Sequence, residues 1–331
     1  MSTTPLSLEQ QEVVDLPGGD LFVSACPGAG KTHTVVERFI TRCQALPQNR
    51  GVAIVSFSRV AAVEVRKRCL DKELSRLLGF PHFVGTLDSF FIRYLYLPLA
   101  QARSGKRVRV LDSWESIGAC VQLRGTKTVP GKGVPLDAFP FDGQRVQFES
   151  SRLRREFSGW KAQIQAHLAD WERAATAKRE GLHRGGLRTC DEMRIAVAKT
   201  FASERWNFVL RALAARFCEV IVDEAQDCDE SQVAVLSRMR DAGTRLVLVA
   251  DVDQAIYEFR KASPACLLKL AKTLRPLKYE VTGEARLPFV PWPTRLCRLN
   301  APTFSLWEKR KGAHGPFGWS HTKLVQSAKR V

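Results

Sequence analysis

The stretch Asp20-Leu-Phe-Val-Ser-Ala-Cys-Pro-Gly-Ala-Gly-Lys-Thr32 decides the fold of this chain. Its first half predicts a buried strand over residues 21–24, and its small residues predict a tight loop over residues 25–30. A helix is predicted over residues 31–43, because apolar side chains recur there at helical spacing and form one face: Val35, Val36, Phe39, Ile40 and Cys43. A strand, a glycine-containing loop and a helix in this order are the pattern of a phosphate-binding loop.

The loop has the pattern A-x-x-G-x-G-K-T, in which Ala25 stands where the usual pattern has its first glycine. Gly28 and Gly30 let backbone N–H groups turn toward phosphate oxygens, and the helix N-terminus adds a partial positive charge. Lys31 is predicted to reach the β- and γ-phosphates, and the Thr32 hydroxyl to bind Mg²⁺. A tight turn without a nucleotide is the alternative. The predicted nucleotide-binding residues are Ala25, Cys26, Pro27, Gly28, Ala29, Gly30, Lys31 and Thr32.

Charge and composition narrow the class of partner. The 331 residues include 51 Lys and Arg but only 34 Asp and Glu, a formal net charge of +17. A protein this basic usually binds a polyanion, and nucleic acid is the first candidate, with a merely solubilising surface as the alternative. No apolar run approaches the about 20 residues of a membrane span, so we expect a cytoplasmic protein without a membrane partner. The nine cysteines include no C-x-x-C pair, which predicts reduced thiols and no zinc site.

Further strands are predicted over residues 52–57, 83–84, 219–222 and 245–250, where apolar residues run almost continuously. Such strands belong to parallel sheets that are buried on both faces. A helix over residues 60–74 is expected to turn one face inward, which carries Ala61, Ala62, Val65, Cys69 and Leu70. The alternation of strands and helices predicts a doubly wound α/β domain. Ligands of these sheets bind at the carboxyl ends of the strands, so five side chains should converge there: Lys31, Asp223, Glu224, Asp251 and Gln254.

The middle of the chain has a different character, which predicts a helical insertion subdomain over residues 95–216. Residues 125–143 are rich in glycine and proline and predict a loop or hairpin, and residues 151–182 have a helical pattern with Trp160 and Trp171 as expected core residues. The sheet domain then consists of residues 1–94 and 217–285. Residues 286–331 form a basic, proline-containing tail with nine Lys and Arg and one acidic residue.

A second motif, V-D-E-A-Q-D at residues 222–227, follows an apolar strand. A carboxylate at this position, Asp223, can hold Mg²⁺ opposite Thr32, and the next, Glu224, can orient and deprotonate the attacking water. A solvated surface pair is the alternative for an Asp-Glu dipeptide. Its place at the end of a buried strand, in a chain with a phosphate-binding loop, favours the catalytic interpretation.

A third motif, D-x-D-Q-x-I-Y-x-F-R, occupies residues 251–260. With the other two in this order, from about Leu6 to Thr282, the chain closely resembles the UvrD/Rep family of superfamily 1 DNA helicases. The resemblance implies a RecA-like P-loop NTPase sheet with a helical insertion, the cofactors ATP and Mg²⁺, and single-stranded DNA as partner.

The resemblance also implies roles for single residues. Gln10 matches the glutamine that reads adenine, Asp223 the Mg²⁺ carboxylate, and Glu224 the catalytic base. Gln254 matches the γ-phosphate sensor, and His33 follows the loop where an arginine is common. The positions that the family places near single-stranded DNA are Phe57, Arg59, Thr86, Ser89, Tyr257 and Phe259. Stacking of bases on aromatic side chains is tolerant of sequence, whereas core packing is the alternative for Phe57 and Phe259.

Two departures from the family pattern concern DNA contact and catalysis. Asp88 stands where the family commonly has histidine. Residues 282–287 match the family's next motif poorly, with Arg286 as its candidate arginine. The family's second RecA-like domain, which carries the arginine finger, should follow, yet the sequence ends at Val331. We therefore expect a second helicase domain or protein subunit as partner, and no duplex unwinding by these residues alone.

The sequence thus predicts a DNA-stimulated ATPase domain of a UvrD-like helicase or translocase that acts on single-stranded DNA. One alternative is an ATP-dependent DNA-binding subunit or regulator without motor activity. Another is a nucleotide-driven ATPase without DNA, whose basic charge serves RNA or another acidic partner. The rate of ATP hydrolysis with and without single-stranded DNA separates the last alternative from the others.

Overall fold

The computed structural model of the chain describes residues 5–25, 28–105, 107–123, 133–251, 264–273 and 277–281. The chain divides into a unit of residues 1–285 and a unit of residues 286–331. All described residues belong to the first unit. Among them, no helix combines the length and the apolar character needed to cross a membrane.

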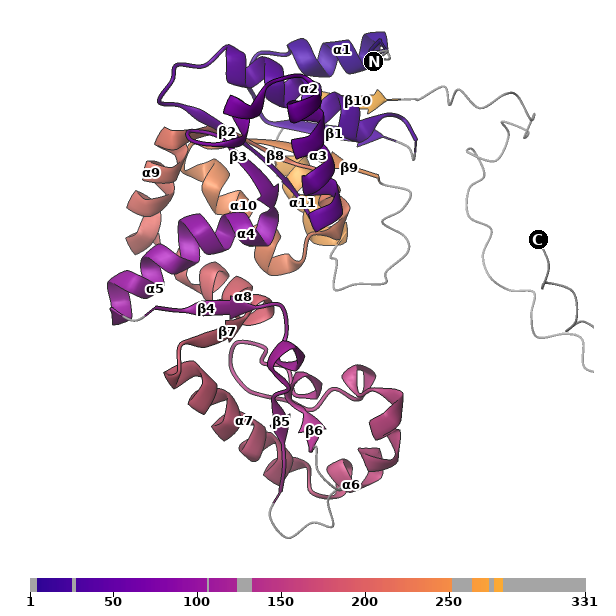
Figure 1. Cartoon of the computed structure of the whole chain (residues 1–331), viewed down its shortest axis with the longest axis vertical. Coiled ribbons are helices and arrows are strands. Elements are labelled where there is room, and N and C mark those ends of the chain that lie inside the picture. The colour runs from indigo at the N-terminus through magenta and orange to yellow at the C-terminus, as the bar shows by residue number, and fades with distance from the viewer. Residues whose placement is uncertain are drawn as a thin grey trace, which may run out of the picture. The chain divides into compact units, whose positions relative to one another are not determined.

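Among the described residues, a six-stranded sheet organises the first unit (Figure 1). Its order is β10-β1-β9-β8-β2-β3, and every neighbouring pair is parallel. The predicted doubly wound α/β class is confirmed, and β10 adds an edge strand that the sequence interpretation missed. The strands are β1 (Leu21–Ala25), β2 (Gly51–Ser56), β3 (Phe83–Thr86), β8 (Phe217–Val222), β9 (Arg245–Ala250) and β10 (Leu277–Val281).

Helices cover both faces of the sheet because successive side chains of each strand point to opposite faces. In β8, Val220 and Val222 pack into one core, whereas Ile221 packs into the other. The core that includes Ile221 contains residues of α1 (Leu8–Asp15), α2 (Lys31–Gln44), α3 (Arg59–Asp71) and the 3₁₀ turn η1 (Ser75–Leu78). In Figure 1, α1, α2 and α3 gather on this side.

In the part of the chain that the structure describes, nine helices and helical turns contribute residues to the opposite core or pack against it. These are α4 (Leu87–Phe91), the π-helical η2 (Ile92–Tyr96), α5 (Leu97–Ser104), α8 (Cys190–Phe201), η7 (Glu204–Trp206), α9 (Asn207–Arg216), η8 (Ala225–Asp227), α10 (Glu230–Asp241) and α11 (Pro264–Thr273). The two cores bury both faces of the sheet, which explains why its strands are nearly continuous apolar runs.

The predicted inner faces of α2 and α3 fit the structure with two exceptions, Ala61 and Leu70 of α3. All five predicted residues of α2 are buried, and α3 buries Ala62, Val65 and Cys69, whereas Ala61 is half-buried. Leu70 was assigned to the same inner face and is instead 54% exposed. Five residues after Val65, its position lies about 140° further round the helix, because each residue turns the helix by about 100°.

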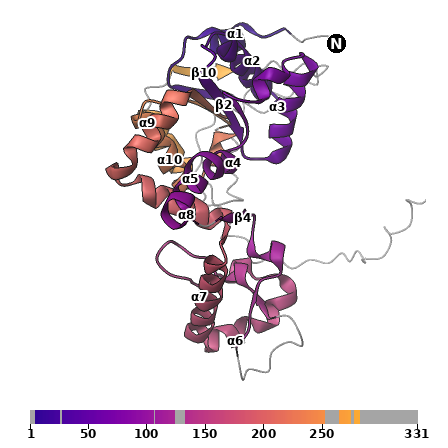
Figure 2. The same ribbon diagram turned by 60° about the vertical axis from the view of Figure 1, so that its left-hand side comes forward.

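A second body with its own core lies between α5 and α8 in the chain, and includes α6 and α7 (Figure 2). Trp171 is fully buried in this core as predicted, whereas Trp160 is partly buried at its edge. The body consists of β4 (Arg109–Leu111), η3 (Trp114–Ile117), β5 (Cys120–Val121), β6 (Val134–Pro135), η4 (Leu136–Ala138), η5 (Ser150–Arg152), η6 (Arg155–Trp160), α6 (Lys161–Ala166), α7 (Leu168–Arg184) and β7 (Leu187–Thr189).

Packing divides the predicted insertion of residues 95–216 into two kinds of segment. Residues from Leu111 to Leu187 supply the separate core. Met193, Val197 and Leu210 instead pack into the core of the sheet. The flanks of the insertion therefore contribute to the sheet domain, while the division at residues 95–216 stays a prediction.

A buried ion pair fixes α1 and α2 to the sheet. Arg38 of α2 donates two hydrogen bonds of 2.9 Å to Glu219 of β8, and both side chains are 0% exposed. The same guanidinium donates to the carbonyl oxygens of Val13 (2.6 Å) and Leu16 (3.2 Å) at the end of α1. Arg38 thus holds the short first helix against the sheet and next to the phosphate-binding loop.

Candidate nucleotide site

The phosphate-binding loop joins the carboxyl end of β1 to the N-terminus of α2. Gly28 and Gly30 both have φ of +77°, a left-handed conformation that glycine adopts without strain. A Cβ atom on Gly30 would lie 2.7 Å from the Nε2 of Gln10, whereas a Cβ atom on Gly28 would meet no atom within 4 Å. The two glycines therefore serve different needs, a close approach to α1 at Gly30 and a backbone open to a ligand at Gly28.

Lys31 extends its ammonium group to the ends of three strands. The Nζ atom lies 3.1 Å from Asp251 Oδ2 beyond β9, 4.0 Å from Glu224 Oε2 beyond β8, and 3.5 Å from the carbonyl oxygen of Ala25 in β1. The Asp251 side chain is 1% exposed and forms a buried ion pair with Lys31. The structure brings Lys31, Asp223, Glu224 and Asp251 together at the carboxyl edge of the sheet, and their convergence on a nucleotide stays a prediction.

Asp223 and Thr32 face each other across the same edge. The Thr32 hydroxyl donates to Asp223 Oδ2 at 3.5 Å. Burial, with a smaller contribution from the charge of Glu224, raises the pKa of Asp223 to about 6, although the backbone N–H of Glu224, Lys31 and Thr32 act in the opposite direction. Two oxygens that bind one octahedral Mg²⁺ at about 2.1 Å lie about 3 Å apart. The hydroxyl and carboxylate oxygens of this pair therefore fit a divalent cation, which would also offset the buried charge.

Glu224 has a left-handed backbone with φ of +55°, which is uncommon for a residue with a side chain. Its carboxylate accepts a hydrogen bond of 2.5 Å from Gln226 Nε2, and the Oε1 of the same Gln226 accepts from the backbone N–H of Asp251 at 3.0 Å. Gln226 therefore fixes the candidate base relative to Asp251. The sequence interpretation gave Gln226 no role, although its place inside the V-D-E-A-Q-D motif, beside Asp223 and Glu224, could have identified it as a site residue.

Comparison with known proteins identifies the family to which this sequence belongs. The family model described as the UvrD/REP helicase N-terminal domain matches residues 6–275. The chain belongs to this family. A UvrD/REP N-terminal domain has the RecA-like P-loop fold, in agreement with the sheet and the loop described above.

Curated relatives of this UvrD/REP domain are helicases by name. DNA helicase II of Escherichia coli (strain K12) is 24% identical over 267 residues, which cover 78% of this chain and 35% of that protein. ATP-dependent DNA helicase Rep of Buchnera aphidicola subsp. Schizaphis graminum is 22% identical, with 82% and 41% covered. ATP-dependent DNA helicase PcrA of Leuconostoc citreum is 24% identical, with 82% and 35% covered. The chain thus spans well under half the length of these relatives.

Two further residues predicted to bind the nucleotide lie beside the loop of the UvrD/REP domain. Gln10 donates from Nε2 to the Ala29 carbonyl oxygen at 2.8 Å, and its Oε1 accepts from the backbone N–H of Ser7 at 2.9 Å. Each end of the amide keeps one further hydrogen-bonding position, which leaves the adenine contact as a prediction. The His33 ring lies 3.4 Å from Arg68 and 3.8 Å from Glu37, so the structure directs it toward α3.

The predicted DNA-binding residues that the structure describes lie just after β2 and at or just after the end of β3. Thr86 caps α4, accepting from the backbone N–H of Ser89 at 3.1 Å, and the Ser89 hydroxyl donates to the Thr86 carbonyl oxygen at 2.7 Å. Phe57 is half-buried and packs against the sheet core, and its stacking on a base stays a prediction. Arg59 is exposed and pairs with Asp112 at 2.8 Å. Six predicted residues lie outside the described ranges: Cys26, Pro27, Gln254, Tyr257, Phe259 and Arg286.

Asp88, which replaces the family's usual histidine, does not point toward an open surface. Its carboxylate accepts two hydrogen bonds from Arg194 of α8, at 2.8 and 2.6 Å, and one from Gln232 of α10 at 3.0 Å. The structure therefore assigns Asp88 to an ion pair between helices.

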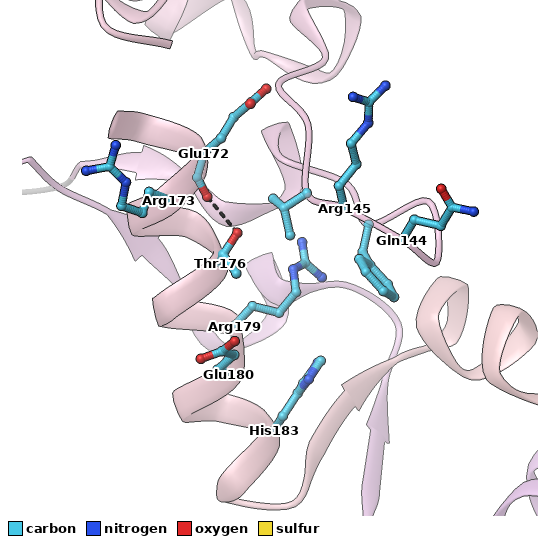
Figure 3. A pocket seen from close by; sticks show the side chains of 10 residues that line it. Gln144, Arg145, Glu172, Arg173, Thr176, Arg179, Glu180 and His183 are labelled. Carbon is cyan, nitrogen blue, oxygen red and sulfur yellow. Dashed lines mark hydrogen bonds between the residues drawn. The ribbon is translucent and has the colours of Figure 1, made fainter. Parts of the chain in front are cut away.

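A cavity of about 470 Å³ lies apart from the nucleotide residues, in the second body (Figure 3). Arg179 and His183 extend from α7 on the same side, whereas Arg173 points away from them. Arg179 pairs with Glu192 and donates to the Phe139 carbonyl oxygen, and His183 lies 3.1 Å from the same Glu192. These contacts tie α7 of the second body to Glu192 of α8, while the Nε atom of Arg179 is buried without a hydrogen-bond partner.

Proposed function

We propose that the chain binds Mg-ATP and hydrolyses it in a DNA-stimulated reaction on single-stranded DNA. The observation that carries this proposal is the convergence of Lys31, Asp223 and Glu224 at one edge of the sheet, next to a loop whose Gly28 backbone is open to a ligand. Ligands of open α/β sheets bind at this edge.

Each group has a separate role in the proposed reaction. Lys31 exchanges its contact with Asp251 for the β- and γ-phosphate oxygens, while the N-terminus of α2 attracts their negative charge. Thr32 and Asp223 would hold Mg²⁺, which supplies neutralisation of the developing phosphate charge. Glu224 orients the attacking water and accepts its proton, and Gln226 limits the motion of that carboxylate.

Two variants test binding and chemistry separately. Lys31→Ala removes the phosphate contact and should abolish most affinity for Mg-ATP, measured with a fluorescent nucleotide. Glu224→Gln keeps the size of the side chain and should preserve binding, while hydrolysis falls by about 10²-fold or more. Native hydrolysis in a folded Glu224→Gln variant would show that Glu224 is not the base. Nucleotide and DNA binding without hydrolysis in the parent would favour the non-motor DNA-binding subunit instead.

The DNA part of the proposal rests on charge and on the turn between β3 and α4. The formal net charge of +17 favours a polyanion. After its capping bond, the Thr86 hydroxyl still has a proton to donate to a phosphate, whereas the Ser89 hydroxyl already donates its proton to the Thr86 carbonyl oxygen. Binding to an oligothymidylate should weaken steeply between 50 and 200 mM salt on the order of tenfold or more, because cationic side chains release counterions from phosphates. Salt-independent affinity contradicts this assignment.

A further inference from the structure

The candidate DNA turn and the candidate nucleotide loop are both packed against one helix, α8. The DNA turn, defined as residues 86–89, begins α4. The nucleotide loop, defined as residues 223–229, leads from β8 to α10. Both α4 and α10 contact α8. A side chain on α8 can therefore contact both sites at once.

Arg194 of α8 has this position. Its Nε and NH2 atoms donate to the two oxygens of Asp88, at 2.8 and 2.6 Å. Its NH1 atom donates to Asp229 at 3.2 Å and to Asp191 on its own helix at 3.1 Å. Asp88 lies inside the DNA turn, and Asp229 is the last residue of the nucleotide loop. One guanidinium thus bridges the two candidate sites directly.

The three side chains of this bridge are largely buried, so each charge needs an opposite charge nearby. The side chains of Arg194, Asp88 and Asp229 are 23%, 22% and 19% exposed. Burial acts to lower the pKa of Arg194, but the hydrogen bonds and charge of Asp88, with the charges of Asp229 and Asp191, outweigh it and raise the pKa well above its ordinary value. Burial also raises the pKa of Asp229. Arg194 therefore stabilises the charges of Asp88 and Asp229, and a second arginine, Arg152, lies 3.5 Å from Asp191.

A short and partly buried segment links Asp229 to the candidate base Glu224. It caps α10 by accepting from the backbone N–H of Gln232 at 2.9 Å, and Cys228 before it is fully buried in the sheet core. Only the single turn η8 separates it from Glu224. The same Gln232 donates to Asp88 at 3.0 Å, a second link across the interface. A shift of the DNA turn thus changes the anchor of the nucleotide loop.

We propose that Arg194 is a positioning residue that couples the DNA turn to the nucleotide loop, through Asp88 on one side and Asp229 on the other. The inference rests on the proposed function, because it presumes that the two sites bind DNA and nucleotide. Arg194 acts in two ways: it fixes the separation of the two segments, and it neutralises a carboxylate that would otherwise repel DNA phosphate two residues from Thr86. Coupling between two ligands is reciprocal, so it is measured from either side.

The test measures the affinity of a slowly hydrolysed fluorescent ATP analogue, with and without saturating oligothymidylate. The ratio of the two dissociation constants is the coupling factor, expected at about fivefold or more for the parent chain. Arg194→Met should reduce it to below about twofold, while the affinity for nucleotide alone changes less than about twofold. Asp88→Asn should give an intermediate ratio, because the amide keeps one hydrogen-bond acceptor for Arg194 and loses the charge.

Arg238→Met is the matched control. Arg238 lies on α10 and donates to the Phe201 carbonyl oxygen at 3.0 Å and to Asn207 at 2.9 Å, so it also ties helices together but contacts neither site. This variant should keep the parent coupling factor, with urea midpoints recorded for all variants. Adding Asp88→Asn to Arg194→Met should restore DNA affinity, since the repulsive charge is gone, without restoring the coupling factor.

Three outcomes overturn the inference. The parent coupling factor can persist in Arg194→Met and Asp88→Asn, or be lost equally in Arg238→Met, which would indicate general loosening. The parent chain can also bind both ligands with a coupling factor of one; this result would overturn the coupling while both binding activities of the proposed function still hold. Failure to bind nucleotide or DNA at all is a different result, because it overturns the proposed function together with the inference.

Discussion

Replacing Arg38 with methionine should remove a large part of the stability of the sheet domain. The substitution keeps an apolar side chain of similar length and deletes the partner of Glu219, which is 0% exposed in β8. Breaking a buried ion pair on one side costs about 3–5 kcal/mol, because a charge stays buried without compensation. Arg42, at 3.4 Å from the same carboxylate, keeps a partial contact and favours the lower part of this range. The free energy of unfolding of an ordinary domain is about 5–15 kcal/mol, so a loss of this size is readily measured.

The paired variant Arg38→Met with Glu219→Leu separates charge from helix anchoring. Removing both charges should return the free energy of unfolding to within about 2 kcal/mol of the parent value. The carbonyl oxygens of Val13 and Leu16 still lack their donor, so α1 stays loosened, and Gln10 holds the phosphate-binding loop less firmly. We therefore expect stability to recover and nucleotide affinity to stay weakened.

Urea unfolding followed by far-ultraviolet circular dichroism measures the first effect, and titration with a fluorescent nucleotide measures the second. A loss below about 1 kcal/mol in Arg38→Met would refute the reasoning, since it would mean that Glu219 tolerates burial alone. A paired variant as unstable as the single one would show that the two carbonyl contacts, and not the ion pair, supply the stability.

Three further predictions concern other positions. The pKa of Asp223 is raised from 3.8 to about 6 in the folded chain, so its carboxylate lowers stability above pH 6, and this cost disappears as the pH falls toward 4. Without Mg²⁺, Asp223→Asn should therefore raise the free energy of unfolding by up to about 3 kcal/mol at pH 7.5 and by much less at pH 4.5. Equal gains at both pH values would contradict this assignment. Gly51→Ala should cost about 1–3 kcal/mol, because its Cβ would overlap the Pro81 carbonyl group, and an unchanged urea midpoint refutes this. Arg59→Ala should change the thermal midpoint little, since the exposed pair of Arg59 with Asp112 contributes about 0–1 kcal/mol. The affinity of this variant for DNA should fall, and unaltered DNA binding would exclude a phosphate contact by Arg59.

Periodicity and short motifs predicted the sheet and the nucleotide edge because both depend on neighbours in the sequence. The strand, loop and helix around Lys31 follow from spacing alone, and the polar residues after β8 and β9 follow from the rule that ligands lie at strand ends. The edge strand β10 was missed because Lys278 and Glu280 interrupt its apolar pattern. Leu70 was misplaced because an apolar residue near the end of a helix need not share the buried face.

Contacts between distant residues could not be predicted from one sequence. Arg38 and Glu219 are 181 positions apart, and Arg194 and Asp88 are 106 apart. Lys, Arg, Asp and Glu are mostly exposed in proteins, so composition gives no reason to pair these residues in the interior. Only the fold brings them together. The sequence showed that Asp88 stands where the family commonly has histidine, but only the structure shows that it pairs with Arg194 of another helix.

The short parallel pair β4–β7 has a consequence for how such a chain can evolve. Leu111 and Thr189 are partners in this pair, so the chain leaves for the second body and returns from it at nearly the same place. Lengthening a connection whose ends are already adjacent costs little free energy, about 0.6 kcal/mol for each doubling of its length. The second body can therefore be enlarged, trimmed or exchanged as a module, while selection on the nucleotide edge continues independently. A domain built in this way can acquire new specificity in one place while the proposed nucleotide site in another stays unchanged.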